Sequence, residues 1–308
     1  MTESSRSEEP EIDYLDRTLQ LVTELNPMHA KRLEKTIDQA DSDYRLQAQE
    51  FFTRYQSYLD QRDKDWTYAV ECYLKVVSDT LFEQVRFQES GHYSCQSFAD
   101  ANEQVYSNPE VMDYYMNGLL MSQFLWKHHY QLFTFFQRCL QDRSGTVSRY
   151  LEIGGGHGAG VVEALKKLEE PKQIDVVDIS PTSLEMTKAL VNDSKVNYHL
   201  QDIFDYHPKA GYDFITLGEV LEHLEDPQAL LVKIRDFLNP EGHLFVTVPA
   251  NAPAIDHIYL FRSPDDIRKI LADSGYKIVE EKILVTDNVT LKEAEQRNLP
   301  LLYGALLK

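Results

Sequence analysis

The 308-residue sequence has few of the residues that mark a disulfide-rich, metal-clustered or membrane-spanning protein. Its three cysteines, Cys72, Cys95 and Cys139, match no metal-binding spacing, so buried and reduced thiols are expected. No apolar run approaches the roughly 20 residues that cross a bilayer. The first residues are acidic and polar, unlike a signal peptide. We therefore expect a cytoplasmic protein with no membrane partner.

Positive charge is also scarce. The chain has 31 Lys and Arg against 50 Asp and Glu, which gives a formal net charge of −19 and a pI near 4.9. A protein that binds nucleic acid replaces counterions on the phosphates with an excess of Lys and Arg. The composition therefore excludes nucleic acid from the expected partners.

Glycine is nearly absent from residues 11–141, where only Gly91 and Gly118 occur. Apolar residues in this stretch recur at helical spacing, which predicts an all-helical domain over residues 11–145 after a disordered tail at residues 1–10. Breaks are expected at the two Asn-Pro pairs and around Gly91. The predicted helices cover residues 11–25, 28–60, 66–88, 97–106, 109–118 and 120–141.

Glycines gather instead after the β-forming run that begins at Tyr150, in the sequence YLEIGGGHGAG. Gly154, Gly156 and Gly158 permit positive φ angles and close approach of the backbone to a ligand. The helix predicted at residues 159–169 would present its free N–H groups to the same ligand. The segment therefore predicts a nucleotide-binding turn between a strand and a helix.

The glycine spacing alone leaves NAD open, because Ala159 is an accepted replacement for the last glycine of the dinucleotide pattern G-x-G-x-x-G. Glu152 argues for another ligand, since its negative charge would repel a pyrophosphate and attract an ammonium or a sulfonium group. Asp178, at the end of the next predicted strand, could accept hydrogen bonds from both hydroxyls of a ribose. Further strands are predicted at residues 174–179, 196–200, 212–217, 242–248, 277–285 and 300–308, with a helix at residues 264–274.

The pattern E-x-G-x-G-x-G at residues 152–158 resembles motif I of the class I S-adenosylmethionine (SAM) methyltransferases. Asp178, the Asp-Ile pair at residues 202–203 and the sequence EVLEHLEDP at residues 219–227 follow in the order of that family, so the resemblance covers residues 149–308. It implies a Rossmann-like α/β fold over residues 146–308, with helices on both faces of a mostly parallel seven-stranded sheet that has one antiparallel strand near its edge. It also implies SAM as cofactor, held by Glu152, Gly154, Gly156, Gly158, Asp178, Ile179, Asp202, Ile203, Leu217 and Glu219.

Residues 113–130, DYYMNGLLMSQFLWKHHY, are unusually rich in aromatic, Met and His side chains. Core packing would explain most of this composition. In the methyltransferase family, however, the chain before the first strand often lies over the SAM pocket, so this domain is expected to bind substrate or act as a lid. The expected substrate contacts are Tyr115, Gln123, Trp126 and His129, followed by Tyr114, Met116 and His128, with His92, Tyr93 and Tyr106 as weaker candidates.

The sequence EVLEH would place Glu219, Glu222 and His223 on one face of a helix, and His257 follows the fifth predicted strand. Two carboxylates and two imidazoles suit a divalent cation, and the arrangement partly resembles the metal site of small-RNA 2′-O-methyltransferases. Ubiquinone-type O-methyltransferases also carry EVLEH with a later histidine and use no metal. We expect His223 and His257 to be catalytic, and a cation held by Glu219, Glu222, His223 and His257 is the alternative.

The resemblance implies a methyltransferase that acts on a small-molecule or peptide-like acceptor. O-methylation is expected first, because an imidazole can remove the proton of a hydroxyl near neutral pH. N- or C-methylation is one alternative, and a catalytically inactive SAM-binding protein with an assembly or regulatory role is another. Variable helices build the acceptor pockets of this fold, so the motifs do not identify the acceptor, nor do they reveal the oligomeric state.

Overall fold

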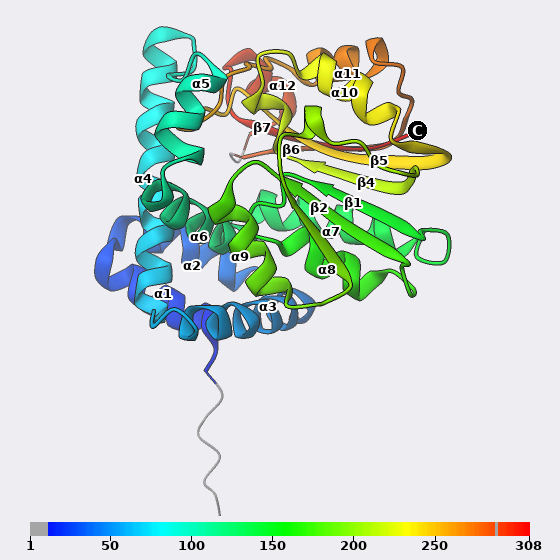
Figure 1. Ribbon diagram of the computed structural model, residues 1–308. Helices are drawn as coiled ribbons and strands as arrows, with labels where there is room; N and C mark the ends of the chain where they lie inside the picture. The colour runs from blue at the N-terminus through cyan, green and yellow to red at the C-terminus, as the bar shows by residue number, and fades with distance from the viewer. Residues whose placement is uncertain (1–11, 287–288) are drawn as a thin grey trace, which may run out of the picture.

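A seven-stranded sheet forms the centre of the molecule, and helices cover both of its faces (Figure 1). The computed structural model describes residues 12–286 and 289–308, so the tail predicted at residues 1–10 lies outside the described residues. The N-terminal helices, blue to teal in Figure 1, lie beside one end of the sheet and beneath it. Among the described residues, none of the helices is long and apolar enough to span a membrane.

The segment before the first strand is helical, as the scarcity of glycine predicts. Side chains of Asp13, Asn26, Asp41, Asp65 and Asn108 accept hydrogen bonds from the first turns and so fix where five of its helices begin. The elements are α1 (Tyr14–Leu25), α2 (Pro27–Asp38), α3 (Ser42–Asp60), α4 (Trp66–Ser90), α5 (Phe98–Ala101), the π-helical turn η1 (Asn102–Tyr106), α6 (Pro109–Leu125) and α7 (Lys127–Gln141).

Two predicted helix boundaries are wrong. The helix predicted over residues 28–60 is interrupted, because the Asp41 side chain accepts from the Tyr44 amide and starts a new helix there. Conversely, the prediction ends one helix at residue 118 and begins the next at residue 120, whereas α6 continues through Gly118 and ends before Trp126. Gly118 is required by packing, since a Cβ at this position would lie 2.6 Å from the Cys72 carbonyl oxygen of α4.

The strands confirm the predicted sheet. Its order is β3-β2-β1-β4-β5-β7-β6, and β7 runs in the direction opposite to the other six strands of the described residues. Because the first five strands are parallel, their carboxyl ends meet at one edge. The strands are β1 (Arg149–Ile153), β2 (Gln173–Asp178), β3 (Val196–Leu200), β4 (Tyr212–Gly218), β5 (Leu238–Ala250), β6 (Ile278–Val285) and β7 (Leu301–Leu307).

The connecting helices lie on both faces of the sheet. Figure 1 shows α8 (Ala159–Lys167) and α9 (Pro181–Val191) on the face that also carries α7, and α10 (Pro227–Arg235) and α11 (Pro264–Asp273) on the other. Two 3₁₀ turns, η2 (Ile203–Asp205) and η3 (Leu221–His223), follow β3 and β4, and α12 (Leu291–Gln296) precedes β7. This arrangement leaves the carboxyl edge of the sheet open to ligands.

The helical segment packs directly onto the sheet. One hydrophobic core contains buried residues of α1 to α4 and α6 to α9 together with one face of the sheet. The ring centroids of Phe135 and Phe136 on α7 lie 5.4 and 5.2 Å from that of Phe245 on β5. Arg54 of α3 donates to the Leu190 carbonyl at the end of α9. The three cysteines are free and buried, as expected. The helical segment is therefore held over the carboxyl edge of the sheet, while its status as a separate domain stays a prediction.

Candidate functional site

A cavity of about 1330 Å³ lies between the carboxyl edge of the sheet and the helices α2, α4, α6 and α7. Open α/β sheets bind ligands at this edge. A pocket for one small ligand measures roughly 300–1,000 Å³, so the cavity has room for more than one. It is the expected place for a cofactor and an acceptor side by side.

The turn after β1 adopts the backbone that the glycines predict. The φ angles are 71° at Gly154, 54° at Gly156 and 84° at Gly158. Residues with a Cβ atom rarely adopt such positive values. Gly158 also precedes the first residue of α8, and a Cβ there would lie 3.0 Å from the Thr187 Cα. The turn brings the N-terminus of α8 to the cavity wall, where free N–H groups face a ligand.

Asp178, the last residue of β2, holds this turn in place. Its carboxylate accepts from the Gly156 amide at 3.2 Å, from the Ser180 amide at 2.8 Å and from the Ser183 hydroxyl at 2.8 Å. Burial raises the pKa of Asp178, and these hydrogen bonds oppose the rise. Asp178 therefore has a structural role besides the predicted contact with a ribose.

Glu152 lies beneath the first turn of α8. Its carboxyl group accepts from the Tyr150 hydroxyl, and a Cβ at Gly160 would lie 2.7 Å from its Oε1. Complete burial raises the pKa of Glu152 to about 8, which the bond from Tyr150 only partly offsets. The group is thus largely protonated at neutral pH when no cation is nearby.

Most of the predicted site residues line this cavity. Leu217 instead packs in the core on the opposite face of the sheet, Gly158 acts through its backbone, and the Tyr114 hydroxyl donates to Asp79 outside the cavity. His92 is an exposed residue away from the wall. The lining residues that the sequence singled out are Glu152, Gly154, Gly156, Asp178, Ile179, Asp202, Ile203, Glu219, His223, His257, Tyr106, Tyr115, Met116, Gln123, Trp126, His128 and His129.

The EVLEH segment does not form the helix that the sequence suggested. Glu219 directly follows β4 in a left-handed conformation with φ 52°, and only Leu221–His223 form a 3₁₀ turn. Glu219 is therefore separated from the group formed by Glu222, His223 and His257, whose ligand atoms all lie within 4.8 Å of one another. Burial raises the pKa of Glu219 to about 7.

Backbone hydrogen bonds bring His257 to this turn from the loop after β5. The Glu222 carbonyl accepts from the amides of Ile258 and Tyr259, both at 2.8 Å. The rings of His223 and His257 are consequently 5.0 Å apart. Sequence reasoning predicted that Glu219, Glu222, His223 and His257 converge at the shared carboxyl edge, and the structure brings the last three together.

Both imidazoles have the same tautomer. His223 Nδ1 lies 3.1 Å from the Asp256 carbonyl oxygen, and His257 Nδ1 lies 2.7 Å from the Ala252 carbonyl oxygen. A carbonyl oxygen only accepts, so each Nδ1 carries a proton, and in the neutral ring Nε2 is the nitrogen with the free lone pair. Burial lowers the pKa of His257 to about 4, which keeps that ring neutral.

Both Nε2 atoms face the carboxylate of Glu222. Its Oε1 lies 3.7 Å from Nε2 of His223 and 3.9 Å from Nε2 of His257. Glu222 is fully buried, and neither of its carboxylate oxygens has a hydrogen-bond partner among the described residues. A buried carboxyl group without a partner is costly unless it is protonated or meets a cation. The cluster can therefore accept a proton or coordinate an ion.

Asp256 links this cluster to the helices, and the sequence analysis did not single it out. Its carboxylate accepts from the Tyr106 hydroxyl at 3.3 Å and the Tyr115 hydroxyl at 3.1 Å, and Tyr106 also lies 2.9 Å from His223 Nδ1. The adjacent His257 was the one signal that could have pointed to it. Through Asp256, α6 and the π-helical turn orient His223.

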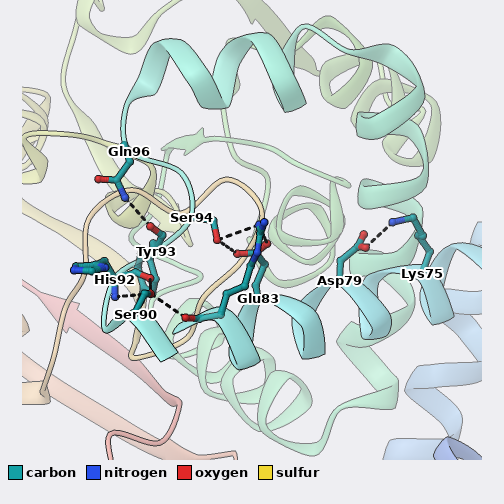
Figure 2. A network of polar contacts seen from close by, with 9 residues as sticks. Lys75, Asp79, Glu83, Ser90, His92, Tyr93, Ser94 and Gln96 are labelled. Carbon is teal, nitrogen blue, oxygen red and sulfur yellow. Dashed lines mark hydrogen bonds and ion pairs between the residues drawn. The ribbon is translucent and has the colours of Figure 1, made fainter. Parts of the chain in front are cut away.

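Tyr93 is held behind the cluster by the loop that follows α4. Figure 2 shows this loop attached to the helix, with Ser94 donating to the buried Glu83 and the Gln96 side chain donating to the Tyr93 carbonyl at 2.7 Å. The Tyr93 ring then meets His257 edge-on at 5.7 Å. Tyr93 supports a candidate catalytic histidine and does not line the cavity.

Another part of the cavity wall, around the junction of α6 and α7, consists of aromatic rings and imidazoles. Trp126, between α6 and α7, packs 5.7 Å from His128 and 4.7 Å from His129, and its indole donates to the Tyr73 hydroxyl. Burial lowers the pKa of His128 to about 4 and that of His129 well below its usual value. Both rings are neutral, so this wall suits an apolar or aromatic group.

Comparisons with known proteins agree with this architecture. A family model described as a methyltransferase domain matches residues 125–281. The chain is 29% identical over 111 residues to a ubiquinone biosynthesis O-methyltransferase of Xanthomonas campestris, covering 35% of this chain and 45% of that protein. It is 30% identical over 95 residues to malonyl-[acyl-carrier protein] O-methyltransferase 1 of Ilyobacter polytropus, covering 30% of this chain and 35% of that protein.

Among solved structures, a SAM-dependent methyltransferase from Leishmania major aligns with a TM-score of 0.50 and 20% identity. The alignment covers 68% of this chain and 82% of that one, which supports the shared fold. By contrast, the chain spans less than half the length of the two curated relatives, at 45% and 35%.

Proposed function

The chain belongs to the methyltransferase-domain family, and from this premise we propose that it transfers the methyl group of SAM to a small-molecule acceptor. One observation carries the proposal. The glycine turn with Asp178 and the pair His223 and His257 line the same cavity. A binding turn for a nucleoside and a pair of proton acceptors therefore share one space.

The residues on the β1 and β2 side suit SAM. The Gly154 and Gly156 turn leaves the backbone open to a ligand, and the Asp178 carboxylate lines the cavity beside that turn. Asp202 and Ile203 line the cavity after β3, where an adenine would lie by analogy with the family. The acidic Glu152 and Glu219 complement a ligand with an ammonium and a sulfonium.

We infer that the acceptor atom is an oxygen. Bound SAM supplies an electrophilic methyl group, and a hydroxyl acceptor must lose a proton as the new bond forms. His223 offers an Nε2 lone pair to take that proton, while the Asp256 carbonyl holds its Nδ1–H. His257 has the same orientation and is the second candidate base. N- and C-methylation remain alternatives, and an amine acceptor would need the base less.

Transfer of label from methyl-labelled SAM to a metabolite extract tests the activity, and titration calorimetry with S-adenosylhomocysteine tests the cofactor site. Binding with labelled product supports the enzyme. Binding without product in any extract would favour the alternative of a SAM-binding assembly or regulatory protein. Absence of binding would overturn the proposal as a whole.

A divalent cation is the second candidate for the cluster, supported by the two Nε2 lone pairs that face Glu222. Histidines that bind metals usually donate their other N–H to a carbonyl or a carboxylate, as His223 and His257 do. Glu222 would supply one oxygen ligand, with Glu219 as an outer neighbour. A cation there would lower the pKa of an acceptor hydroxyl and replace the general base.

Chelation separates the two versions. If the cluster works without metal, EDTA leaves turnover unchanged. If it holds a cation, EDTA abolishes turnover and one divalent ion restores it, and E222Q weakens that ion's binding about 10- to 100-fold or more because few ligands remain. Calorimetry with Mg²⁺, Mn²⁺ and Zn²⁺ on protein from which EDTA has removed metal measures ion binding at this site, and it does not require the acceptor.

A further inference from the structure

The charges that line the cavity are separated by segment. Among the described residues, the seven acidic ones that line the cavity all lie between Glu152 and Asp256, in the part that carries the sheet. All four lining Lys and Arg, which are Lys31, Arg32, Lys35 and Lys127, lie on α2 and at the start of α7. The cavity therefore has an acidic end beside the glycine turn and a basic end between the helices.

Three exposed lysines lie at the basic end, and their place on the cavity wall distinguishes them from other exposed lysines without an ion pair among the described residues, such as Lys172 and Lys188. Lys31 and Lys35 are one turn apart on α2, Lys127 begins α7, and all three are exposed. Acidic residues outnumber basic ones by 50 to 31, yet none of these lysines forms an ion pair within the part of the chain that the structure describes. Lys75 and Lys166, in contrast, pair with Asp79 and Glu50.

The wall between the two ends is apolar. The neutral His128 and His129 lie beside Trp126, and Tyr73 accepts from the Trp126 indole. Side chains such as Leu33 and Val76 complete this part of the lining. A molecule that fills the helical end thus contacts an apolar surface inside the cavity and the lysines at its rim.

We propose that the methyl acceptor is an organic acid, with an apolar or aromatic body against Trp126 and an anionic group at the rim formed by Lys31, Lys35 and Lys127. This inference rests on the proposed function and names its substrate class. The electrostatics are complementary, because the acidic end favours a cationic cofactor and the basic end an anionic acceptor. The unpaired rim would also steer anions into a molecule whose net charge otherwise repels them.

The test uses the full-length protein loaded with S-adenosylhomocysteine, so that the cofactor end is filled. Three probes with one ring system are titrated by calorimetry: naphthalene-2-carboxylate, 2-naphthyl phosphate and the neutral naphthalene-2-carboxamide. We expect at least one anion to bind about tenfold more tightly than the amide, as two or three exposed ion pairs would give. The tighter of the two anions identifies the acid as a carboxylate or a phosphate.

Matched double variants locate the effect. K31E/K35E should weaken binding of the preferred anion about three- to tenfold and leave the amide unchanged. K172E/K188E makes the same change in net charge at exposed lysines outside the cavity and should change neither. Equal affinity for all three probes, no binding of either anion, or equal losses in both double variants would overturn the inference. Failure to bind S-adenosylhomocysteine would instead overturn the proposed function.

Discussion

The two ends of the cavity are built in different ways. The cofactor end consists mainly of backbone at the carboxyl ends of adjacent strands, as at Gly154, Gly156 and Glu219. The helical end consists of side chains from helices far apart in sequence, such as Tyr73, Trp126 and His129. His223 lies between them, since it follows β4 but is oriented by Tyr106 and Asp256.

This difference separates binding from chemistry. Changes at the cofactor end should alter affinity for SAM, because they remove acceptors and reshape the turn. Changes at the histidine cluster and the helical end should alter turnover, because they act on the acceptor and its proton. Each of the following variants tests on which side of this division a residue falls.

The largest effect is expected for H223A. Loss of the general base should lower kcat by about 10²- to 10⁴-fold, while affinity for S-adenosylhomocysteine changes little, since a base acts mainly in the transition state. H243A serves as the control, because His243 lies on β5 and does not line the cavity. A fall in cofactor affinity as large as the fall in kcat would assign His223 to the cofactor end instead.

The pH dependence of stability tests Glu152. Its folded pKa of about 8 exceeds the ordinary value of 4.5, so the folded protein keeps a proton that the unfolded chain has lost. The contribution of Glu152 to the free energy of unfolding should therefore be greatest below pH 4.5. It should fall as the pH rises towards 8, by up to about 1.4 kcal/mol per pH unit.

Denaturant titrations of the ligand-free protein at pH 5, 6 and 7 measure this slope. E152Q should reduce it, and the exposed-site variant E185Q should leave it unchanged. An identical slope in E152Q and in the parent protein would show that Glu152 is ionised in the fold.

D178A should weaken binding of S-adenosylhomocysteine by about 1–3 kcal/mol, because a ribose acceptor is lost and the Gly156 turn loses its anchor. S183A removes one hydrogen-bond partner of the same carboxylate but keeps the ribose acceptor, so it separates the loss of the anchor from the loss of the ribose contact. If S183A costs as much as D178A, the role of Asp178 is to hold the turn. If affinity in D178A is unchanged, the ribose contact does not exist.

The smallest effect is expected for Y106F. Losing the hydroxyl near His223 Nδ1 and Asp256 should raise the activation free energy of turnover by about 0.5–1.5 kcal/mol, the usual contribution of one hydrogen bond, and kcat should fall accordingly. Affinity for S-adenosylhomocysteine should not change. An unchanged kcat in Y106F would limit Tyr106 to packing.

The elements of the sheet could be predicted from the sequence, because each strand is a local run of β-forming residues and each break is marked by glycine, proline or a capping residue. The positions of the breaks between helices were harder to predict from the sequence. Gly118 was taken as an end of helix, yet it lies inside α6 to let α4 approach. That requirement depends on the partner helix and leaves no mark in the flanking sequence.

The candidate site shows the same limit. The order of strands implied that Glu222, His223 and His257 share one edge, and they do. Asp256 carries no motif of its own, and its importance comes from Tyr106 and Tyr115, which lie more than a hundred residues earlier. Nor did the sequence separate Glu219 from the cluster, since the left-handed backbone at this residue replaces the expected helix.

The sequence by itself determined the strand and helix order, the glycine turn and the residues at each strand end, because these follow from local preferences and from the fixed geometry of parallel strands. Only the tertiary structure decided which side chains meet across the cavity. Helix packing orients His223 through Asp256, leaves Glu222 without a hydrogen-bond partner among the described residues, and places the lysines of α2 and α7 on the wall of one cavity. Those outcomes depend on contacts between distant segments, which local sequence patterns do not encode.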